Sequence, residues 1–180
     1  QVAVTTVAQR ARAVAGTAQT GPLANDEILT INGISISLNA GLTKTHVIDR
    51  INTFSAQTGV TADDASGNTR LYTSEFGSNA KISVTSNQAA TATSSGFGPA
   101  EIVGTGTDIV GTICGTSFIG NGNVLRANTG AAKGFVVQIA AAAADPTRTV
   151  TVAQGNVAVT DNSLVFQIGP NSNQSTKISI

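Results

Sequence analysis

The dipeptide Asn32-Gly33 constrains the fold of this chain more than any other feature of its sequence. Apolar residues alternate with polar ones on both sides of it, in the segments 28–31 and 34–38. Asn and Gly both accept the positive φ angles of a type I′ turn, which suits the twist of a two-residue hairpin. The sequence therefore predicts a β-hairpin over residues 28–38, with its apolar side chains on one face.

A helix is predicted next, over residues 43–58. Thr43 suits the N-cap position, because its hydroxyl can accept a hydrogen bond from an early helical N–H. The apolar residues behind it share one helical face, since they are spaced by one, three and three residues. Gly59 suits the left-handed conformation that ends many helices. The residues of this apolar face are Val47, Ile48, Ile51 and Phe54.

Further strands are predicted after the helix. Val60 and Ala62 begin one, the segment 66–68 (Ser-Gly-Asn) supplies a turn, and Leu71 resumes the apolar alternation. A last strand spans 82–84. The segment 28–84 thus predicts a β-β-α-β-β unit with mostly antiparallel pairing, in which one helix covers one face of one sheet.

For the whole chain the pattern predicts an α+β, β-rich fold in four parts. The unit just described is one part, and the low-complexity segment 87–98 separates it from a glycine-punctuated region typical of a small all-β domain. The predicted parts are residues 1–21 (a first strand and a linker), 22–87 (the β-β-α-β-β domain), 88–160 (the glycine-rich all-β domain) and 161–180 (return strands).

Within these parts the strands are expected at short apolar runs, and the loops at glycine and proline. Residues 1–7 read as the first strand, and Arg10, Arg12 and Gly16 read as loop. Asp145-Pro146 reads as a turn. The remaining predicted strands lie at 102–103, 108–113, 124–125, 135–139, 149–152, 157–159, 164–168 and 177–180.

Composition narrows the classes of partner. Only 11% of the residues are charged, against roughly a quarter in average domains, and the formal net charge is zero. The chain therefore lacks the basic field that binds a phosphate backbone, so no nucleic-acid partner is expected. Aromatic residues make up 4% of the chain, so the core is expected to consist of Val, Ile, Leu and Ala.

Targeting and redox features are sparse. No apolar run approaches the roughly 20 residues of a membrane span, so no membrane partner is expected. The chain does not begin with Met and shows no signal peptide, and we expect it to be part of a longer protein. Cys114 is the single cysteine and is predicted to be a small buried side chain.

Every candidate for chemistry has a simpler structural interpretation. His46, the only histidine, is expected at an exposed helix position rather than in a catalytic triad or zinc site. Asp63, Asp64 and Asn68 lack the ligand order of a calcium loop and are expected in a hairpin turn. The segments 104–106 and 120–122 lack a complete phosphate-loop pattern. The remaining acids considered for glycoside hydrolysis are scattered: Asp26, Glu27, Glu75 and Glu101.

We therefore predict no catalytic, metal or cofactor-binding residue and no enzyme activity. A series of short motifs instead runs through the segment 28–84: Leu29-Thr30-Ile31-Asn32-Gly33, Val47-Ile48, Ile51-Asn52, Thr58-Gly59-Val60-Thr61-Ala62, Arg70-Leu71, Thr73-Ser74, Gly77-Ser78 and Ile82-Ser83-Val84. In this order they resemble the repeat of bacterial flagellins and flagellar hook-associated proteins. The resemblance covers about a third of the chain, and Tyr72 is bulkier than the pattern usually has.

A second resemblance favours flagellin within this family. Phe166–Asn171, Gln174 and Ile178–Ile180 are similar to the segment where flagellins return from their outer domains to the helical rod. The chain contains no long helices of the kind by which flagellins polymerise. The resemblance thus implies the solvent-facing outer region of a filament subunit, extracellular and part of the flagellum.

That resemblance also implies partners. Other flagellin subunits would be contacted through helical ends that this chain does not contain, and host or environmental ligands would meet its surface. The isolated fragment is expected to be a monomer. Two alternatives stay open: a filament-cap or hook-associated protein that shares the repeat, and a secreted carbohydrate-binding or adhesive module.

The hairpin assignment predicts that Gly33→Val destabilises the protein by roughly 1–2 kcal/mol, because a β-branched residue resists positive φ. Urea denaturation would measure the change. An unaltered midpoint would show that Gly33 does not occupy such a turn.

Overall fold

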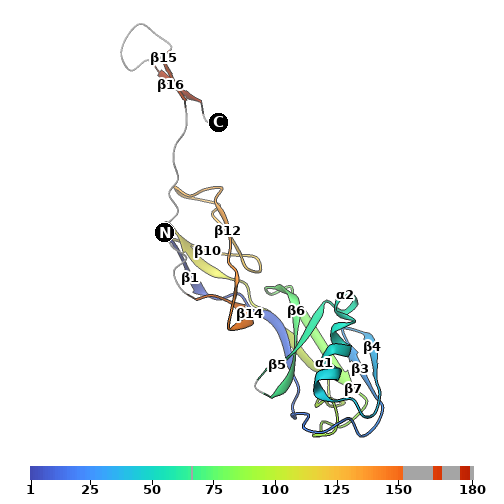
Figure 1. The fold of residues 1–180 in the computed structure, drawn as a ribbon. Coiled ribbons are helices and arrows are strands. Elements are labelled where there is room, and N and C mark those ends of the chain that lie inside the picture. Colours follow the sequence, from blue (N-terminus) through green and yellow to red (C-terminus); the bar gives the residue numbers. More distant parts are fainter. Residues whose placement is uncertain (66, 152–163, 168–174, 179–180) are drawn as a thin grey trace.

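The computed structural model describes residues 1–65, 67–151, 164–167 and 175–178. Two separate hydrophobic clusters divide residues 1–151 into two lobes, which lie end to end (Figure 1). We call residues 10–105 the first lobe, and residues 1–8 with 107–151 the second lobe. The first lobe is therefore an insertion within the second. The fold is α+β and β-rich, as predicted.

The first lobe contains two antiparallel sheets and two short helices. One sheet has four strands, in the order β4 (Ile34–Leu38), β3 (Glu27–Ile31), β7 (Lys81–Ser86) and β8 (Ile102–Thr105). The other has three, in the order β2 (Arg10–Val14), β6 (Asn68–Phe76) and β5 (Val60–Ala65). The helices are α1 (Lys44–Asn52) and α2 (Ser55–Thr58).

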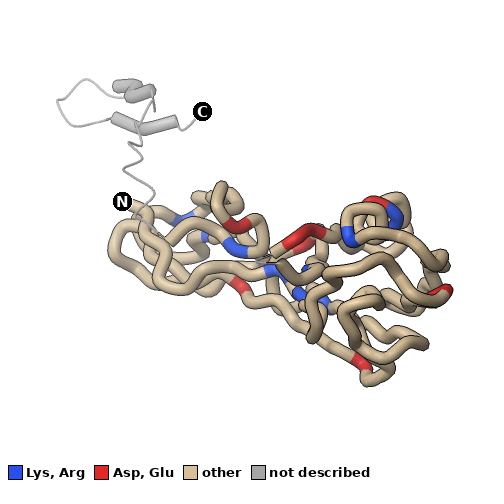
Figure 2. Tube along the Cα trace, turned by 60° about the horizontal axis from the view of Figure 1, so that its bottom comes forward, with Lys and Arg blue, Asp and Glu red and all other residues tan. Residues whose placement is uncertain are grey.

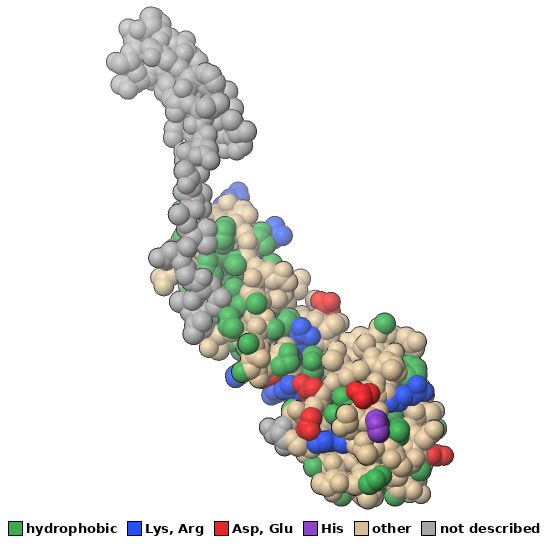
Figure 3. Space-filling model, viewed as in Figure 1, with side chains coloured by type: hydrophobic (Ala, Val, Ile, Leu, Met, Phe, Trp, Pro, Cys, Tyr) green, Lys and Arg blue, Asp and Glu red, His purple; other side chains and the backbone are tan. Residues whose placement is uncertain are grey.

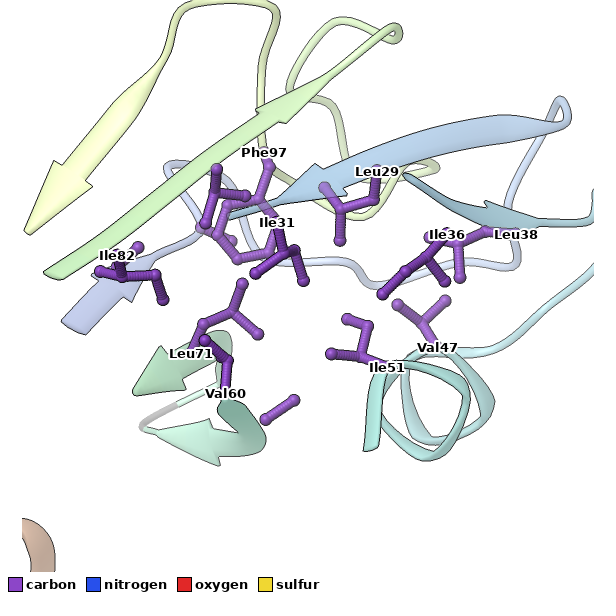
Figure 4. Close-up of a cluster of buried hydrophobic side chains, with 14 of the residues drawn as sticks. Leu29, Ile31, Ile36, Leu38, Val47, Ile51, Val60, Leu71, Ile82 and Phe97 are labelled. Carbon is purple, nitrogen blue, oxygen red and sulfur yellow. The ribbon is translucent and has the colours of Figure 1, made fainter. Parts of the chain in front are cut away.

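The core of this lobe lies between the two sheets, with α1 beside β5 in the second layer (Figure 4). The expectation of a helix on a single sheet was incomplete. β7 returns to pair with β3, whereas the β5–β6 hairpin pairs with β2, so the hairpin and the helix together cover the four-stranded sheet. Side chains that are at most 1% exposed fill the gap: Leu29, Ile31, Ile36, Leu38, Val47, Ile51, Val60 and Leu71.

The hairpin turn follows the prediction. Asn32 has φ +50° and Gly33 has φ +81°, and the flanking strands β3 and β4 pair residue by residue from Ile31 and Ile34 outward. Positive φ at both central residues is the requirement of a type I′ turn. The observed register of these two strands is the one that the two-residue turn at Asn32-Gly33 predicts.

The predicted single helix over 43–58 is interrupted. α1 ends at Asn52 because the amide of this residue turns to the main chain of Ala62, donating to its O (3.0 Å) and accepting from its N (2.7 Å). Phe54 leaves helical geometry, with φ −100° and ψ 6°. Gly59 ends α2 in the left-handed conformation, at φ +69°, as predicted. The expected apolar face is formed: Val47 and Ile51 are buried, and Ile48 and Phe54 pack partly buried against the core.

Thr43 occupies the N-cap position with extended backbone, but its hydroxyl makes no capping bond. Instead Thr43 Oγ1 lies 3.2 Å from Nδ1 of His46. The predicted place of the helix start is confirmed, while the predicted capping hydrogen bond was wrong.

The segment expected as a loop at Arg10 and Arg12 is strand β2. Its alanines Ala11 and Ala13 point into the core and its arginines point outward. Because alanine is small and only weakly apolar, this alternation was not recognised as a strand pattern. Residues 88–105, expected to begin another domain, complete the first lobe. They supply β8 and Phe97, which is fully buried in its core.

The second lobe is built of small antiparallel sheets, and its core contains Ile109, Ile113, Phe118, Leu125 and Ile139. The first predicted strand is present as β1. The strands pair as β1 (Val2–Thr6), β9 (Val110–Ile113) and β10 (Thr116–Ile119); β11 (Val124–Arg126) with β12 (Val136–Gln138); and β13 (Ala141–Ala142) with β14 (Asp145–Thr149). β10 and β13 were not predicted.

Two predictions for the second lobe need correction. A third prediction falls on residues that the structure does not describe. Asp145-Pro146 is not a turn: it begins β14, where an irregularity in the pairing with β13 accommodates a proline that cannot donate. The turn falls at residues 143–144, and the strand expected over 149–152 ends at Thr149. The strand predicted at 157–159 is outside the described residues.

Near the C-terminal end, β15 (Leu164–Gln167) pairs antiparallel with β16 (Ser175–Ile178). β15 lies within the strand predicted at 164–168, whereas β16 shares only residues 177 and 178 with the strand predicted at 177–180. The pairing runs from Leu164 with Ile178 to Gln167 with Ser175.

Phe97 gives a direct test of the corrected boundary. Phe97→Ala should lower the free energy of unfolding by about 3–5 kcal/mol, because it removes a fully buried ring and leaves a cavity. Urea denaturation of this variant beside Phe54→Ala, which removes a partly buried ring, provides the comparison. Equal, small losses would show that residues 88–105 are not part of the first core.

Candidate functional site

The structure separates the residues that were considered for chemistry. His46 lies exposed on α1, as predicted, and Figure 3 shows it on the surface. Its one described side-chain contact is with Thr43. No group of three or more His, Cys, Asp or Glu within the described part of the chain could hold a metal ion.

Asp63 and Asp64 belong to the β5–β6 hairpin, but they lie in strand β5 and Asn68 begins β6, so none of the three is in the turn where they were expected. Asp63 forms two contacts with Arg70, and Asp64 forms an ion pair with Lys44 (2.5 Å) and accepts from the N–H of Gly67 (3.0 Å). Asn68 donates to the carbonyl of Ala15 at 3.0 Å. These side chains therefore diverge and do not surround a common point.

Cys114 is exposed, and the prediction that it is buried was wrong. Cys114 and Gly115 form a two-residue turn between β9 and β10, with φ +50° and +82°, close to the angles of Asn32 and Gly33. Residues at the tip of a hairpin point away from the sheet and into solvent. The apolar neighbour Ile113 therefore suggested burial for Cys114 wrongly. Of the glycine-rich fragments, 104–106 ends strand β8 and 120–122 follows β10.

Glu27 has a setting that its sequence neighbours did not indicate. It is 1% exposed, and its carboxylate accepts hydrogen bonds from Ser86 Oγ (2.6 Å), from the N–H of Ser95 (2.8 Å) and from Ser95 Oγ. These three donors satisfy the buried carboxyl oxygens and attach the low-complexity segment to β3. The other scattered acids, Asp26, Glu75 and Glu101, are exposed.

The polar residues of the sequence motifs have specific structural roles. Asn32 donates to the carbonyl of Thr58 and accepts from the N–H of Ser83, both at 2.9 Å, so the turn is attached to the helix end and to β7. Asn52 binds the main chain of Ala62, as described above. The apolar motif residues form the core, and the polar ones join its elements.

Charged residues gather where the two lobes meet (Figure 2). Arg70 of β6 donates through Nε and Nη2 to Asp63, at 2.9 and 2.6 Å, and through Nη1 to Asp145 of β14 at 3.1 Å. The hydrogen bond from Arg70 to Asp63 raises the pKa of the guanidinium against the effect of burial. Arg148 adds a weaker contact to Asp145, at 3.5 Å.

Two carboxylates at this junction are held in their charged form. For Asp108, the hydroxyl of Ser78 lowers the pKa most, and the N–H groups of Gly122 and Ser78 lower it further. For Asp145, burial acts upward, but hydrogen bonds from Thr147 and the charges of Arg70 and Arg148 outweigh it and lower the pKa. The junction is therefore an array of ion pairs and hydrogen bonds that joins elements of the two lobes.

Tyr72, the bulky departure from the motif, is part of the same region. It is 9% exposed and lies 5.6 Å from the guanidinium carbons of both Arg10 and Arg70. Burial raises the pKa of its hydroxyl, and the charge of Asp63 adds to this. Its ring thus contributes cation–π contacts beside the junction.

Among the hollows of the described surface, one is apolar and another is lined by both lobes. An apolar one of about 210 Å³ lies in the second lobe, and a more polar groove of about 530 Å³ is lined by residues of both lobes. No helix among the described residues combines the length and the apolar character that crossing a membrane requires. The apolar hollow includes Val2, Ile113, Cys114, Lys133 and Phe135, and the groove includes Arg10, Glu75, Phe76, Asn123 and Gln138.

Comparisons with known proteins found likeness only among solved structures. No protein-family profile and no curated sequence matches the chain. The D2-D3 domains of the flagellar cap protein FliD from Escherichia coli are 17% identical, with a TM-score of 0.42 over 87% of this chain and 83% of theirs. The same domains from Serratia marcescens are 16% identical, with a TM-score of 0.44 over 99% and 91%. FliD (HAP2) from Pseudomonas aeruginosa PAO1 is 15% identical, with a TM-score of 0.44 over 80% of each chain.

The lowered pKa values at the junction predict acid sensitivity. A carboxylate with a lowered pKa stabilises the folded state at pH values above its unfolded pKa of about 3.9, and this contribution is lost as the pH falls through the folded value. Stability should therefore fall below about pH 4, and Asp145→Asn should remove part of that dependence and about 1–2 kcal/mol at pH 7.

Urea denaturation between pH 3 and pH 7 measures both effects. Asp64→Asn is the matched control, since its ion pair lies within the first lobe and its side chain is 44% exposed. We expect a loss below about 1 kcal/mol for this control. Identical pH profiles for the Asp145→Asn variant and the wild type would contradict the assignment.

Proposed function

We propose that this chain is an outer, structural part of a flagellar filament-associated protein, with no enzymatic role. The observation that carries the proposal is the motif series in the segment 28–84. Its apolar residues build one continuous core, and its Asn32 and Asn52 make the hydrogen bonds that join the hairpin, the helices and β5. The motif residues therefore form most of the core of the first lobe, which β2, β8 and Phe97 complete.

Within this class we place the cap or hook-associated proteins ahead of flagellin. The flagellin interpretation rests on Phe166–Asn171, Gln174 and Ile178–Ile180, most of which are outside the described residues. The repeat in 28–84 is shared by both kinds of protein, so it supports the wider class. The similar structures named above are cap proteins.

The proposed role follows from the kind of surface the chain presents. Only 11% of the residues are charged, and they are spread over both lobes with some gathered at the junction, so most of the surface is uncharged (Figures 2 and 3). Such a surface suits a secreted domain that stands off an assembled filament. The partners we propose are the other subunits of that assembly, contacted through parts of the protein beyond this chain.

Immunogold electron microscopy would test the proposal and divide its alternatives. Antibodies raised against the 180-residue chain are applied to flagellated cells of its source. We expect label at the filament tip for a cap protein, or at the hook junction for a hook-associated protein. Label along the entire filament would instead indicate flagellin, and absence of label from the flagellum of expressing cells would refute the proposal.

A further inference from the structure

The two lobes are connected by a narrow neck. The chain of residues 1–151 passes between them twice, at Gln9 and at Gly106. Gln9 and Thr107 exchange two main-chain hydrogen bonds of 2.9 Å, and Gln9 also pairs with Arg148 of β14. So short a set of pairings would bend and twist easily if nothing else joined the lobes.

One additional attachment is centred on Asp108. This residue of the second lobe accepts from Ser78 of the first lobe through both N–H (3.2 Å) and Oγ (2.5 Å), and from the N–H of Gly122 at 2.8 Å. The loop that carries Ser78 is packed closely, because a Cβ on Gly77 would collide with Asp108 Oδ1 and with the main chain of Gly122. The carboxylate therefore connects a rigid loop of one lobe to the other lobe.

A second attachment is centred on Asp145. Arg70 donates to it from the first lobe, and Asp63 fixes the orientation of Arg70 by a two-point contact. The side chains of Arg70 and Asp145 are 13% and 23% exposed, so solvent screens this pair only in part. The planar guanidinium of Arg70 is hydrogen-bonded to Asp63 on one side and to Asp145 on the other. These bonds restrain the relative position of the two lobes by their direction as well as by charge.

The two attachments are well separated. Arg70 lies near the start of β6 and Ser78 lies just after its end, eight residues later, which corresponds to roughly 25 Å of extended chain. Two contacts at such a separation oppose rotation about a neck more effectively than two adjacent contacts would. Each of them depends on a single carboxylate of the second lobe.

We propose that Asp108 and Asp145 lock the two lobes into one rigid body, and that removing both charges lets the lobes move about the neck while each stays folded. The inference is independent of the proposed function, because it concerns contacts within this chain alone. Each lobe has its own hydrophobic cluster, and Phe76 of β6 also packs against the cluster of the second lobe, so we expect both lobes to stay folded when the two charges are removed.

Double electron–electron resonance tests this directly on the 180-residue chain. Spin labels are attached to the native Cys114, which is exposed on the second lobe, and to Thr45→Cys, at an exposed position of α1 in the first lobe. We expect a narrow distance distribution for this labelled chain. Its width should at least double when Asp108→Asn and Asp145→Asn are combined, and should be intermediate for Asp145→Asn alone.

Asp64→Asn is the matched control, since it removes an ion pair of the first lobe only, and its distribution should stay narrow. Hydrogen exchange of the core amides near Ile31 and Ile113 reports whether each lobe is folded. An unchanged width in the folded double variant would overturn the proposal, as would a broad distribution before any lock is removed. Loss of exchange protection in either core would also overturn it, because the lobes would then not be independent of the locks.

Discussion

The main-chain pairing of Gln9 with Thr107 is the constraint on which the rest of the structure depends. It brings together two residues that are separated by the whole of the first lobe and closes that lobe into a unit of its own. β1 and β9 then continue as neighbours in the second lobe, while β2 and β8 continue in the first. Two small cores result, each compatible with a chain that contains few aromatic side chains.

Local sequence predicted the parts of the fold that depend on local interactions. Asn32-Gly33 determined a hairpin, Gly59 ended a helix, and the spacing of Val47 and Ile51 gave its buried face. The break after Asn52 escaped prediction because it depends on Ala62, ten residues away. The spacing of apolar residues within the helix does not indicate that the Asn52 side chain will hydrogen-bond to strand β5, which follows the helix.

Long-range pairing accounts for most of what the sequence did not predict. Ala11 and Ala13 are the inward-facing residues of β2, but alanine has a weak preference for strands. The segment becomes a strand because it pairs with β6. Phe97 lies in a low-complexity segment whose place in the core depends on Ser95 bonding to Glu27, 68 residues earlier. In the same way, no local pattern connects Arg70 with Asp145, 75 residues later.

The exposure of His46 was predicted correctly because its immediate neighbours decide its surroundings. Asp63 and Asp64 were expected in the turn but lie in strand β5, since their pairing with β6 extends to Ala65. The exposure of Cys114 was not predicted, because its apolar neighbours suggested burial whereas the turn geometry exposes it. The interpretation of the chain as non-enzymatic stays a prediction. The junction of the lobes, where ionisable groups do converge, was not anticipated.

The insertion of one lobe within the other also bears on how such a chain can change over generations. Because the two ends of residues 10–105 lie side by side, the gene segment that encodes this lobe is a self-contained cassette. If that segment is exchanged, lost or replaced, β1 and β9 can still pair as antiparallel neighbours. One recombination event can therefore replace the first lobe while the second lobe keeps its strand pairing.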